Sequence, residues 1–300
     1  MTETKKGNMF IIGETILWSL FPIISLLGLE GLPGIVSLFW VNFFTMVFFF
    51  AIVIYRGKIF ELKNKEALFY TLGTVIFINL IFYGLYFFAL GKTTPANAAI
   101  VALFEIVPSY IFFQIIRKER FSAKHIIGIF FAVAGALIVL LPKAGGINPG
   151  DFIILLAVFF APLGNWYQQQ ARKIISTESV LFLRHLIAMP FLFVLAILFK
   201  TSVVDYNISH VFWWLLLNGI LIFGLSKIFW LEAIHRMSVT KAVAVNGLSP
   251  ILTVFFAWFL INQSPTLTQI FSLPFLIIAI LILTDLNFGK KEALIDQNLQ

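Results

Sequence analysis

The stretch TPANAAIVALFEIVPSYIFFQII, Thr94–Ile116, decides the fold of this chain. It is apolar over about 20 residues, the length that a helix needs to cross the hydrocarbon core of a membrane. Glu105 stands at its midpoint, and Pro108 follows one turn later. A carboxylate at that depth costs at least about 2–3 kcal/mol unless it faces a wet cavity or a partner, so Glu105 marks a candidate functional site.

Composition indicates that the whole chain is a membrane protein. Of its 300 residues 60% are hydrophobic and 12% are charged, with a mean hydropathy of +0.99, whereas soluble domains are roughly half apolar. The formal charge of +7 does not indicate nucleic-acid binding, because the basic residues lie in short loops rather than in one patch. The chain has no Cys, and its four His show no metal-ligand spacing, so we expect no metal and no cofactor.

Ten apolar segments separated by short polar breaks predict an all-α protein of ten membrane helices. The predicted helices cover about 8–28, 35–55, 67–89, 94–116, 124–142, 151–171, 178–199, 211–232, 240–261 and 266–285. The first is a membrane helix rather than a cleaved signal, because no A-x-A site follows it. Most of the 21 Lys and Arg residues lie at the N-terminus, in even-numbered loops and in the tail, and only Lys92, Lys143 and Lys200 lie in odd-numbered loops. Both termini are therefore predicted to be cytoplasmic.

The two halves of the chain show the same pattern. Ala96–Ala99 leads to Pro108 in the first half, as Val243–Val245 leads to Pro250 in the second. Five helices per copy is an odd number, so the second copy must be inverted in the membrane. Inverted repeats are typical of transporters that bind their substrate near the middle of the membrane. We predict a first repeat over 8–142, a second over 150–285 and a cytoplasmic tail over 286–300.

With these features the chain resembles the EamA-type transporters of the drug/metabolite transporter superfamily. The motifs that carry the resemblance are Trp18 in LWSLFP, Phe88–Leu90, Asn97–Ala99, Pro108 and Arg184 in LFLRHLIA. The resemblance implies that a small organic solute passes through a central basket lined by helices 1–4 and 6–9, with helices 5 and 10 at the periphery. The position matching Arg184 in the first repeat is Asn42, where the family often has a basic residue.

Glu105 and Pro108 are the first candidate site residues. Pro108 cannot donate a backbone hydrogen bond, which leaves the carbonyl of Phe104 free and kinks the helix beside the carboxylate. Ala98 and Ala102 lie on the same helical face as Glu105 and make room for water or solute. The alternative is a static carboxylate buried against another helix. The matching position in the second repeat is Gly247, so the acid has no counterpart there.

Four more ionisable residues lie inside predicted helices. Arg184 offers a planar fork to a substrate carboxylate or to Glu105, and His185 belongs to the residue type that titrates near neutral pH. As neighbours they point about 100° apart and do not face one groove together. Glu14 and Lys227 lie near the cytoplasmic ends of their helices, where an ion pair between them would form a gate. The alternatives are a structural bond for Arg184 or His185, and snorkelling of Lys227 to the interface.

The remaining candidates are aromatic, amide and proline side chains at matching depth, which together predict an amphipathic chamber. Taken singly, each aromatic residue is equally compatible with packing. The predicted substrate-binding residues are Trp18, Tyr83, Asn97, Glu105, Asn165, Trp166, Arg184, Trp230 and Asn246. The predicted coupling or gating residues are Glu14, Glu105, Pro108, His185, Lys227 and Pro250.

These features predict a secondary transporter, an exporter or facilitator, for small organic metabolites such as amino acids. It would work by alternating access in the cytoplasmic membrane of a bacterium, as a monomer or homodimer among lipids, with Glu105 as the hypothetical carrier of a coupling proton. No Walker-type loop occurs, so ATP drive within the chain is not expected. The alternative is a lipid or polyisoprenoid-sugar flippase. An intramembrane lipid-phosphate enzyme is less favoured, because clustered carboxylates and basic clamps are lacking.

Overall fold

The computed structural model describes residues 3–117, 123–140, 148–199, 201, 203 and 206–283, and all regular structure within these ranges is helical. Eight helical segments in them are long and apolar enough to cross a membrane, and Ile126–Leu140 and Leu267–Ile282 are two shorter apolar helices. A helical segment thus occupies each of the ten predicted ranges. The predicted tail, 286–300, lies outside the described residues, as do Lys143 and Lys200.

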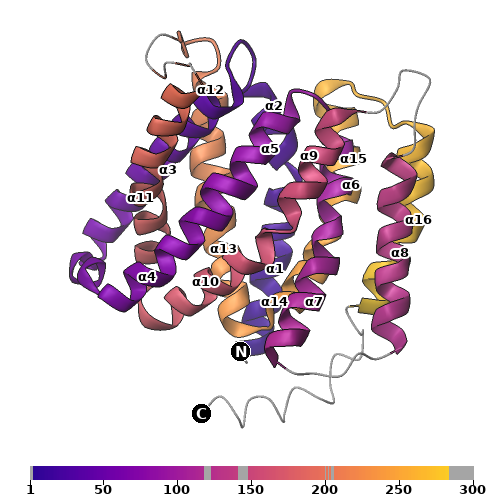
Figure 1. Ribbon diagram of the computed structural model, residues 1–300, viewed down its shortest axis with the longest axis horizontal. Coiled ribbons are helices and arrows are strands. Elements are labelled where there is room, and N and C mark those ends of the chain that lie inside the picture. Colours follow the sequence, from indigo (N-terminus) through magenta and orange to yellow (C-terminus); the bar gives the residue numbers. More distant parts are fainter. Residues whose placement is uncertain are drawn as a thin grey trace.

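The helices of the first half run back and forth across the bundle (Figure 1). In chain order they are α1 (Glu3–Ser19), α2 (Phe21–Leu27), α3 (Gly34–Tyr55), the short η1 (Ile59–Lys63), α4 (Lys65–Thr74), η2 (Val75–Phe82), α5 (Tyr83–Leu90), α6 (Pro95–Ala102), η3 (Leu103–Glu105), α7 (Ile106–Arg117) and α8 (Ala123–Leu140). We call the side of the bundle at which α1 begins the N-terminal side.

The second half has the same succession of long, interrupted and uninterrupted helices. In chain order they are α9 (Pro149–Val158), α10 (Ala161–Ile174), α11 (Thr177–Leu198), α12 (Phe212–Leu217), η4 (Asn218–Ser226), α13 (Lys227–Arg236), α14 (Val239–Asn246), α15 (Ser249–Ile261) and α16 (Leu267–Leu283). Two interruptions are π-helical, η2 and η4, and they occupy corresponding places in the two halves.

Proline accounts for several of the interruptions. Pro22, Pro162 and Pro250 each stand in the first turn of a new helix, α2, α10 and α15, where a missing backbone N–H leaves no bond unmade. The stretch Thr94–Ile116 contains one continuous helical span, Pro95–Phe113, in agreement with the sequence prediction. Within it the α-helical pattern gives way to η3 after Ala102 and resumes at Ile106, because Pro108 has no N–H for the carbonyl of Phe104.

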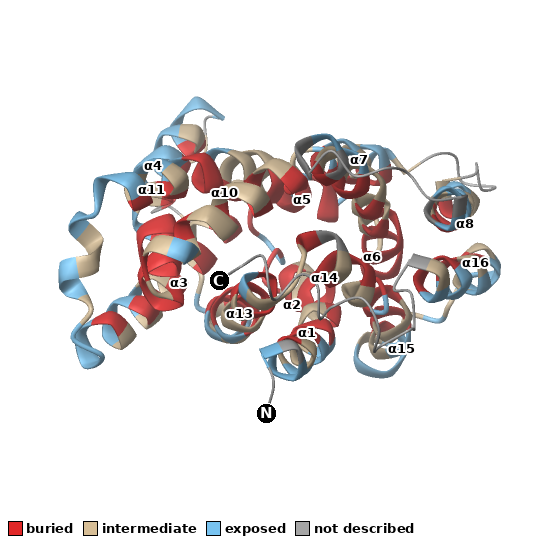
Figure 2. Ribbon diagram, turned by 90° about the horizontal axis from the view of Figure 1, so that it is seen from below, coloured by how far each residue is buried: buried red, intermediate tan, exposed pale blue. Residues whose placement is uncertain are grey.

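The bundle is elongated when it is viewed along its helices (Figure 2). The views of Figures 1 and 2 agree that α8 and α16 lie side by side at one end, where they pack against each other. They correspond to the predicted helices 5 and 10, which the resemblance implied to be peripheral. Towards the other end α3 packs against α11.

The helices α3 and α11 have equal lengths, 22 residues each. Asn42 is the ninth residue of α3, and the ninth residue of α11 is His185 rather than Arg184. Counted from the helix starts, Asn42 therefore stands level with His185, one residue away from the sequence match with Arg184.

Burial is distributed as a bilayer requires. Large apolar side chains such as Phe130, Trp213 and Phe259 are 65%, 70% and 75% exposed on the outside of the bundle, whereas Arg184 and His185 are buried within it. Figure 2 shows the buried residues on the inner faces of the helices and the exposed residues outside. Lipid is as apolar as a phenylalanine side chain, so the many outward-facing Phe residues need no protein partner.

Candidate functional site

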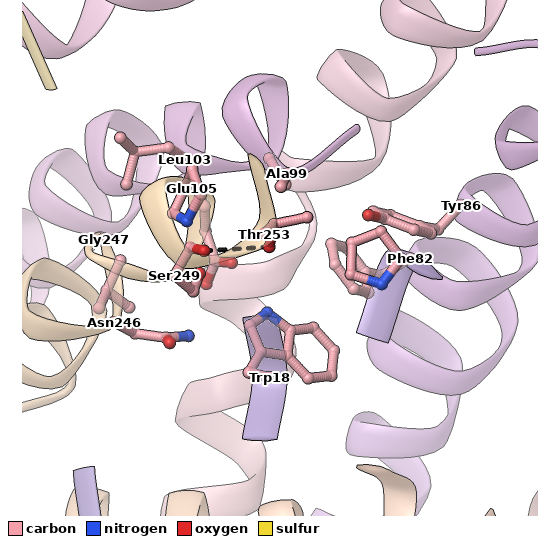
Figure 3. A pocket seen from close by; sticks show the side chains of 14 residues that line it. Trp18, Phe82, Tyr86, Ala99, Leu103, Glu105, Asn246, Gly247, Ser249 and Thr253 are labelled. Carbon is pink, nitrogen blue, oxygen red and sulfur yellow. Dashed lines mark hydrogen bonds between the residues drawn. The ribbon is translucent and has the colours of Figure 1, made fainter. Parts of the chain in front are cut away.

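Two adjoining cavities lie between the two halves of the chain. Both are lined by Trp18, Phe82, Glu105, Val243 and Asn246. Each has a volume of about 50 Å³, room for a few water molecules. Figure 3 shows side chains from several helices of both halves around the first cavity. The walls are therefore built from the segments at or beside the helix interruptions.

The two cavities differ in polarity. The first extends away from the N-terminal side, and its further lining includes Pro22, Tyr86, Ala99, Pro250 and Thr253. The second extends towards the N-terminal side and carries more charge. Its further lining includes Glu14, Tyr83, Asn165, Gln168, Arg184, Lys227 and Trp230. Four ionisable side chains of opposite sign thus meet in the second cavity.

Glu105 is held by an amide rather than by a cation. Asn165 Nδ2 donates a hydrogen bond to Glu105 Oε1 at 3.0 Å, and Trp230 Nε1 donates to Asn165 Oδ1 at 3.3 Å. Among the described residues no Lys, Arg or His nitrogen lies within salt-bridge distance of Glu105. The carboxylate is half-buried and lines both cavities, so one face of it is available to water or to a solute.

Glu14 and Lys227 form the ion pair that the sequence suggested. Lys227 Nζ lies 2.9 Å from Glu14 Oε1, and both side chains are almost completely buried. The same ammonium lies 3.3 Å from the centroid of the Trp18 ring, within cation–π distance. The pair joins α1 of the first half to α13 of the second, one turn to the N-terminal side of Trp18.

Arg184 is a buried cation without a carboxylate partner in the described part of the chain. Its Nη1 donates to Gln168 Oε1 at 2.5 Å, and its guanidinium carbon lies 6.0 Å from the centroid of the Tyr83 ring. Its Nε has no hydrogen-bond partner. Burying a guanidinium without an anion is unfavourable, so a group that accepts hydrogen bonds would stabilise this site.

Three polar atoms of cavity-lining residues have no hydrogen-bond partner: Arg184 Nε, Glu14 Oε2 and Asn246 Oδ1. Such orphan groups are rare in folded proteins and need an explanation when they occur. Here one is a donor and two are acceptors. A solute that both accepts and donates hydrogen bonds complements this set.

The ion pairs between the two halves all lie on the N-terminal side, within the described residues. They are Glu14–Lys227, Glu3–Arg236 at 2.9 Å and Arg56–Glu178 at 3.2 Å. On the opposite side, the described contacts between the halves include a bond from His210 Nε2 to the carbonyl of Glu30 at 2.8 Å. Ion pairs thus join the two halves on the N-terminal side.

A loop of the first half also binds a helix start of the second. Glu61 Oε2 accepts hydrogen bonds from the Ser176 backbone N–H at 2.8 Å and from its hydroxyl at 2.6 Å. Partial burial opposes ionisation of Glu61, but the two bonds from Ser176 outweigh it and lower the pKa of this carboxyl to about 2. Glu61 lies in η1, outside the membrane-spanning segments.

The structure brings together most of the residues singled out from the sequence. Those that line one or both cavities are Glu14, Trp18, Tyr83, Glu105, Asn165, Arg184, Lys227, Trp230, Asn246 and Pro250. Those that line neither are Asn97, Pro108, Trp166 and His185.

Two residues outside the cavities have other partners. Asn97 donates to Asp151 Oδ2 at 3.0 Å and accepts from Gln269 Nε2 at 2.7 Å, which ties the starts of α6, α9 and α16 together. Trp166 packs edge-on to Tyr70 at 6.1 Å. Pro108 acts through the interruption at η3.

The lining residues that sequence reasoning missed include Phe82, Tyr86, Gln168 and Val243. Gln168 stands three residues after Asn165, a spacing that puts both amides on one helical face, so this signal was available. Phe82 and Tyr86 share the i, i+4 spacing of a helical face, but in so aromatic a chain such a pair carries little information.

Apolar helices around a charged internal cavity define a multi-pass membrane protein. The profile of the "EamA-like transporter family" matches the chain twice, over residues 5–141 and 148–285. The chain therefore belongs to this family of the drug/metabolite transporter superfamily, and it is a membrane transporter. No described feature favours a lipid or polyisoprenoid-sugar flippase.

Individual relatives agree with this assignment. A protein of Bacillus subtilis (strain 168) described as "Uncharacterized transporter YoaV" is 19% identical over 279 residues, which cover 88% of this chain and 92% of that protein. A solved structure titled "Crystal structure of protein" superimposes with a TM-score of 0.71 at 18% identity, over 99% of both chains. The latter similarity demonstrates a shared fold.

Proposed function

We propose that this chain carries small zwitterionic metabolites, amino acids and similar solutes, by alternating access across the cytoplasmic membrane of a bacterium. It would have ten membrane helices with both termini in the cytoplasm, the first repeat over 8–142 and the second over 150–285. The observation that carries the proposal is that Glu105 and Arg184, of opposite charge and from different halves, line one cavity without ionic partners among the described residues.

The charges suggest how such a solute would be oriented. The Arg184 guanidinium would bind its carboxylate, for which a planar fork is suited. Glu105, with Asn246 beside it, would bind its ammonium group. The rings of Trp18 and Trp230 would contact its apolar part. The orphan donor on Arg184 and the orphan acceptor on Asn246 would then both be satisfied.

The gate of the N-terminal side would be the Glu14–Lys227 pair. It spans the two halves, so a movement of one half against the other that opens this side must separate it. The pair also holds Trp18 over the cavities through the ammonium. The interruptions at Pro108 and Pro250 would let the two cavity-lining helices bend during this movement.

A panel of amino acids with matched analogues tests the solute class. L-Phenylalanine, L-threonine and L-leucine are compared with the amine and the acid that lack one charged group, by thermal shift of the purified protein and by uptake into proteoliposomes. Ligand binding raises apparent stability with the logarithm of occupancy. We expect at least one amino acid to stabilise the protein and both of its analogues to do so less. Equal binding of the singly charged analogues would contradict the zwitterion proposal.

Proton coupling through Glu105 is tested in the same liposomes. Glu105→Gln keeps the shape and the bond from Asn165 but cannot release a proton. We expect uptake by this variant to lose its response to an imposed pH gradient. The control is Glu30→Gln, an exposed acid in the loop before α3, for which we expect wild-type behaviour. Undiminished pH-driven uptake by Glu105→Gln would rule the role out.

A further inference from the structure

Asn42 and His185, one from each half of the chain, bond to each other twice. Asn42 Nδ2 donates to the His185 carbonyl at 2.9 Å, and Asn42 Oδ1 lies 2.5 Å from His185 Nδ1. Both residues are completely buried, and each is the ninth residue of a 22-residue helix. The contact therefore joins α3 of the first half to α11 of the second.

The partners of His185 determine where its ring carries a proton. The amide of Asn42 is oriented by its bond to the carbonyl, so its Oδ1, which only accepts, faces Nδ1. Nδ1 must then carry a hydrogen. On the other side of the ring Nε2 lies 3.4 Å from Arg184 Nη2, which only donates, so Nε2 must present its lone pair. Both contacts require the same neutral tautomer.

The rest of the environment favours this state. Asn79 Nδ2 donates to Asn42 Oδ1 at 3.1 Å, which occupies its second lone pair and fixes the orientation of the amide. The ring of His185 lies parallel to Phe49 with centroids 6.3 Å apart and near Phe223 at 6.2 Å. No carboxylate among the described residues bonds the ring, and a doubly protonated ring would set two cations against each other beside Arg184.

We infer that His185 is a positioning residue: fixed as the neutral Nδ1–H tautomer by Asn42, it accepts a hydrogen bond from Arg184 and aims the guanidinium at the anionic group of the solute. This inference rests on the proposed function for the identity of that anionic group. His185 itself lines neither cavity, and so it acts through Arg184. Gln168 holds the guanidinium from the other side, and the hydrogen-bonded chain joins four helices of both halves.

The tautomer is tested by nitrogen NMR without any solute. Protein labelled with ¹⁵N only in histidine carries four labelled residues, and the spectrum of His185→Gln identifies the signals of His185. We expect a protonated Nδ1 and an unprotonated Nε2 throughout the neutral pH range. In Asn42→Ala the ring is expected to lose this preference. A wild-type ring with its proton on Nε2, or on both nitrogens, would overturn the inference whatever the transport activity.

The positioning role is tested by two substitutions of His185, each of which keeps the hydrogen-bonding group of one ring nitrogen. Glutamine reaches about as far as Nε2 and keeps an acceptor for Arg184, whereas asparagine reaches only as far as Nδ1 and keeps the contact with Asn42. We expect His185→Asn to raise the KM of the transported amino acid roughly tenfold, as for one misaligned charge-assisted hydrogen bond. His185→Gln is expected to stay within about threefold of the wild type, with kcat similar in both.

The control is Asn218→Ala. Asn218 is completely buried and bonds Ser25 Oγ at 2.9 Å, but it lines neither cavity, so its loss lowers stability without changing KM. Equal KM values for His185→Asn, His185→Gln and the wild type would overturn the positioning role. A wild-type protein that binds no member of the amino-acid panel would instead contradict the proposed solute class. The NMR experiment needs no solute, so it would still test the tautomer of His185 in that case.

Discussion

The ammonium of Lys227 lies 3.3 Å from the centroid of the Trp18 ring while it also bonds Glu14. Removing it by Lys227→Met leaves Glu14 buried without its partner, which we expect to reduce folding stability by about 3–5 kcal/mol. Glu14→Gln combined with Lys227→Met is expected to recover most of that loss, because no charge remains unpaired. Thermal unfolding of the two variants in detergent measures both effects.

Lys6→Met is the matched control for this pair. Lys6 bonds Glu3 at 2.7 Å, but the two side chains are 45% and 60% exposed, so we expect almost no change in stability. A double variant as unstable as Lys227→Met alone would show that the lysine stabilises through its packing on Trp18 rather than through its charge.

Glu61 gives the fold a dependence on acid pH. Its pKa in the folded protein, about 2, lies below the ordinary carboxyl value of 4.5, so the stabilisation from its bonds to Ser176 is fully present above pH 4.5. The contribution is lost as pH falls from about 4.5 towards 2. We expect Glu61→Gln to lower stability at pH 7 by about 1 kcal/mol and to flatten the fall in stability over this acid range. Unfolding at several pH values measures it, with the exposed Glu66→Gln as control.

Gly34 permits α3 to approach α5 closely. A Cβ at this position would lie 2.5 Å from the backbone carbonyl oxygen of Phe87, and backbone cannot move aside as a flexible side chain can. We therefore expect Gly34→Ala to reduce stability by about 1–3 kcal/mol. Gly84→Ala, on α5 itself, meets nothing within 4 Å and should be neutral or slightly stabilising. Equal stability of the two variants, measured by thermal unfolding, would contradict this packing.

Asn97 and Asn246 were both singled out from the sequence, and the structure gives them different surroundings. Asn97→Ala breaks buried bonds to Asp151 and Gln269, so we expect a loss of about 1–3 kcal/mol in stability with unchanged KM. Asn246→Ala removes an atom without a partner that lines both cavities, so we expect a higher KM at unchanged stability. Uptake kinetics and thermal unfolding of both variants decide, and a reversal of the two results would contradict these assignments.

The helices could be predicted closely because membrane length and apolarity leave few alternatives. The range predicted for the second helix, 35–55, differs by one residue from Gly34–Tyr55. The sequence also indicated that Glu14 could reach Lys227, since both are charged at similar depth. The η2 and η4 segments were not predicted, because a π-helical turn inside an apolar run changes neither composition nor length.

The site was predictable only in part. Arg184 and Glu105 are charged at membrane depth, and that alone marks them. Asn97 is equally polar at a similar depth but belongs to a tie between helix ends. Position in the sequence cannot distinguish a cavity-lining polar residue from one that bonds other helices. The difference lies in the direction in which the side chain points, which depends on how the helix continues after its interruption. The sequence predicted that the neighbours Arg184 and His185 point in different directions. In the structure Arg184 lines the second cavity, whereas His185 lies behind it and bonds Asn42.

The two π-helical segments determine the direction of the residues that follow them. A π-helical turn holds extra residues without lengthening a span in proportion, and each residue turns a helix by about 100°. Tyr83 directly follows η2, and Lys227 directly follows η4. Deleting one apolar residue from η4 would leave the eighth helix nearly as long and as hydrophobic, yet rotate Lys227 away from Glu14. The Glu14–Lys227 ion pair thus depends on the number of residues in η4, which a substitution does not change.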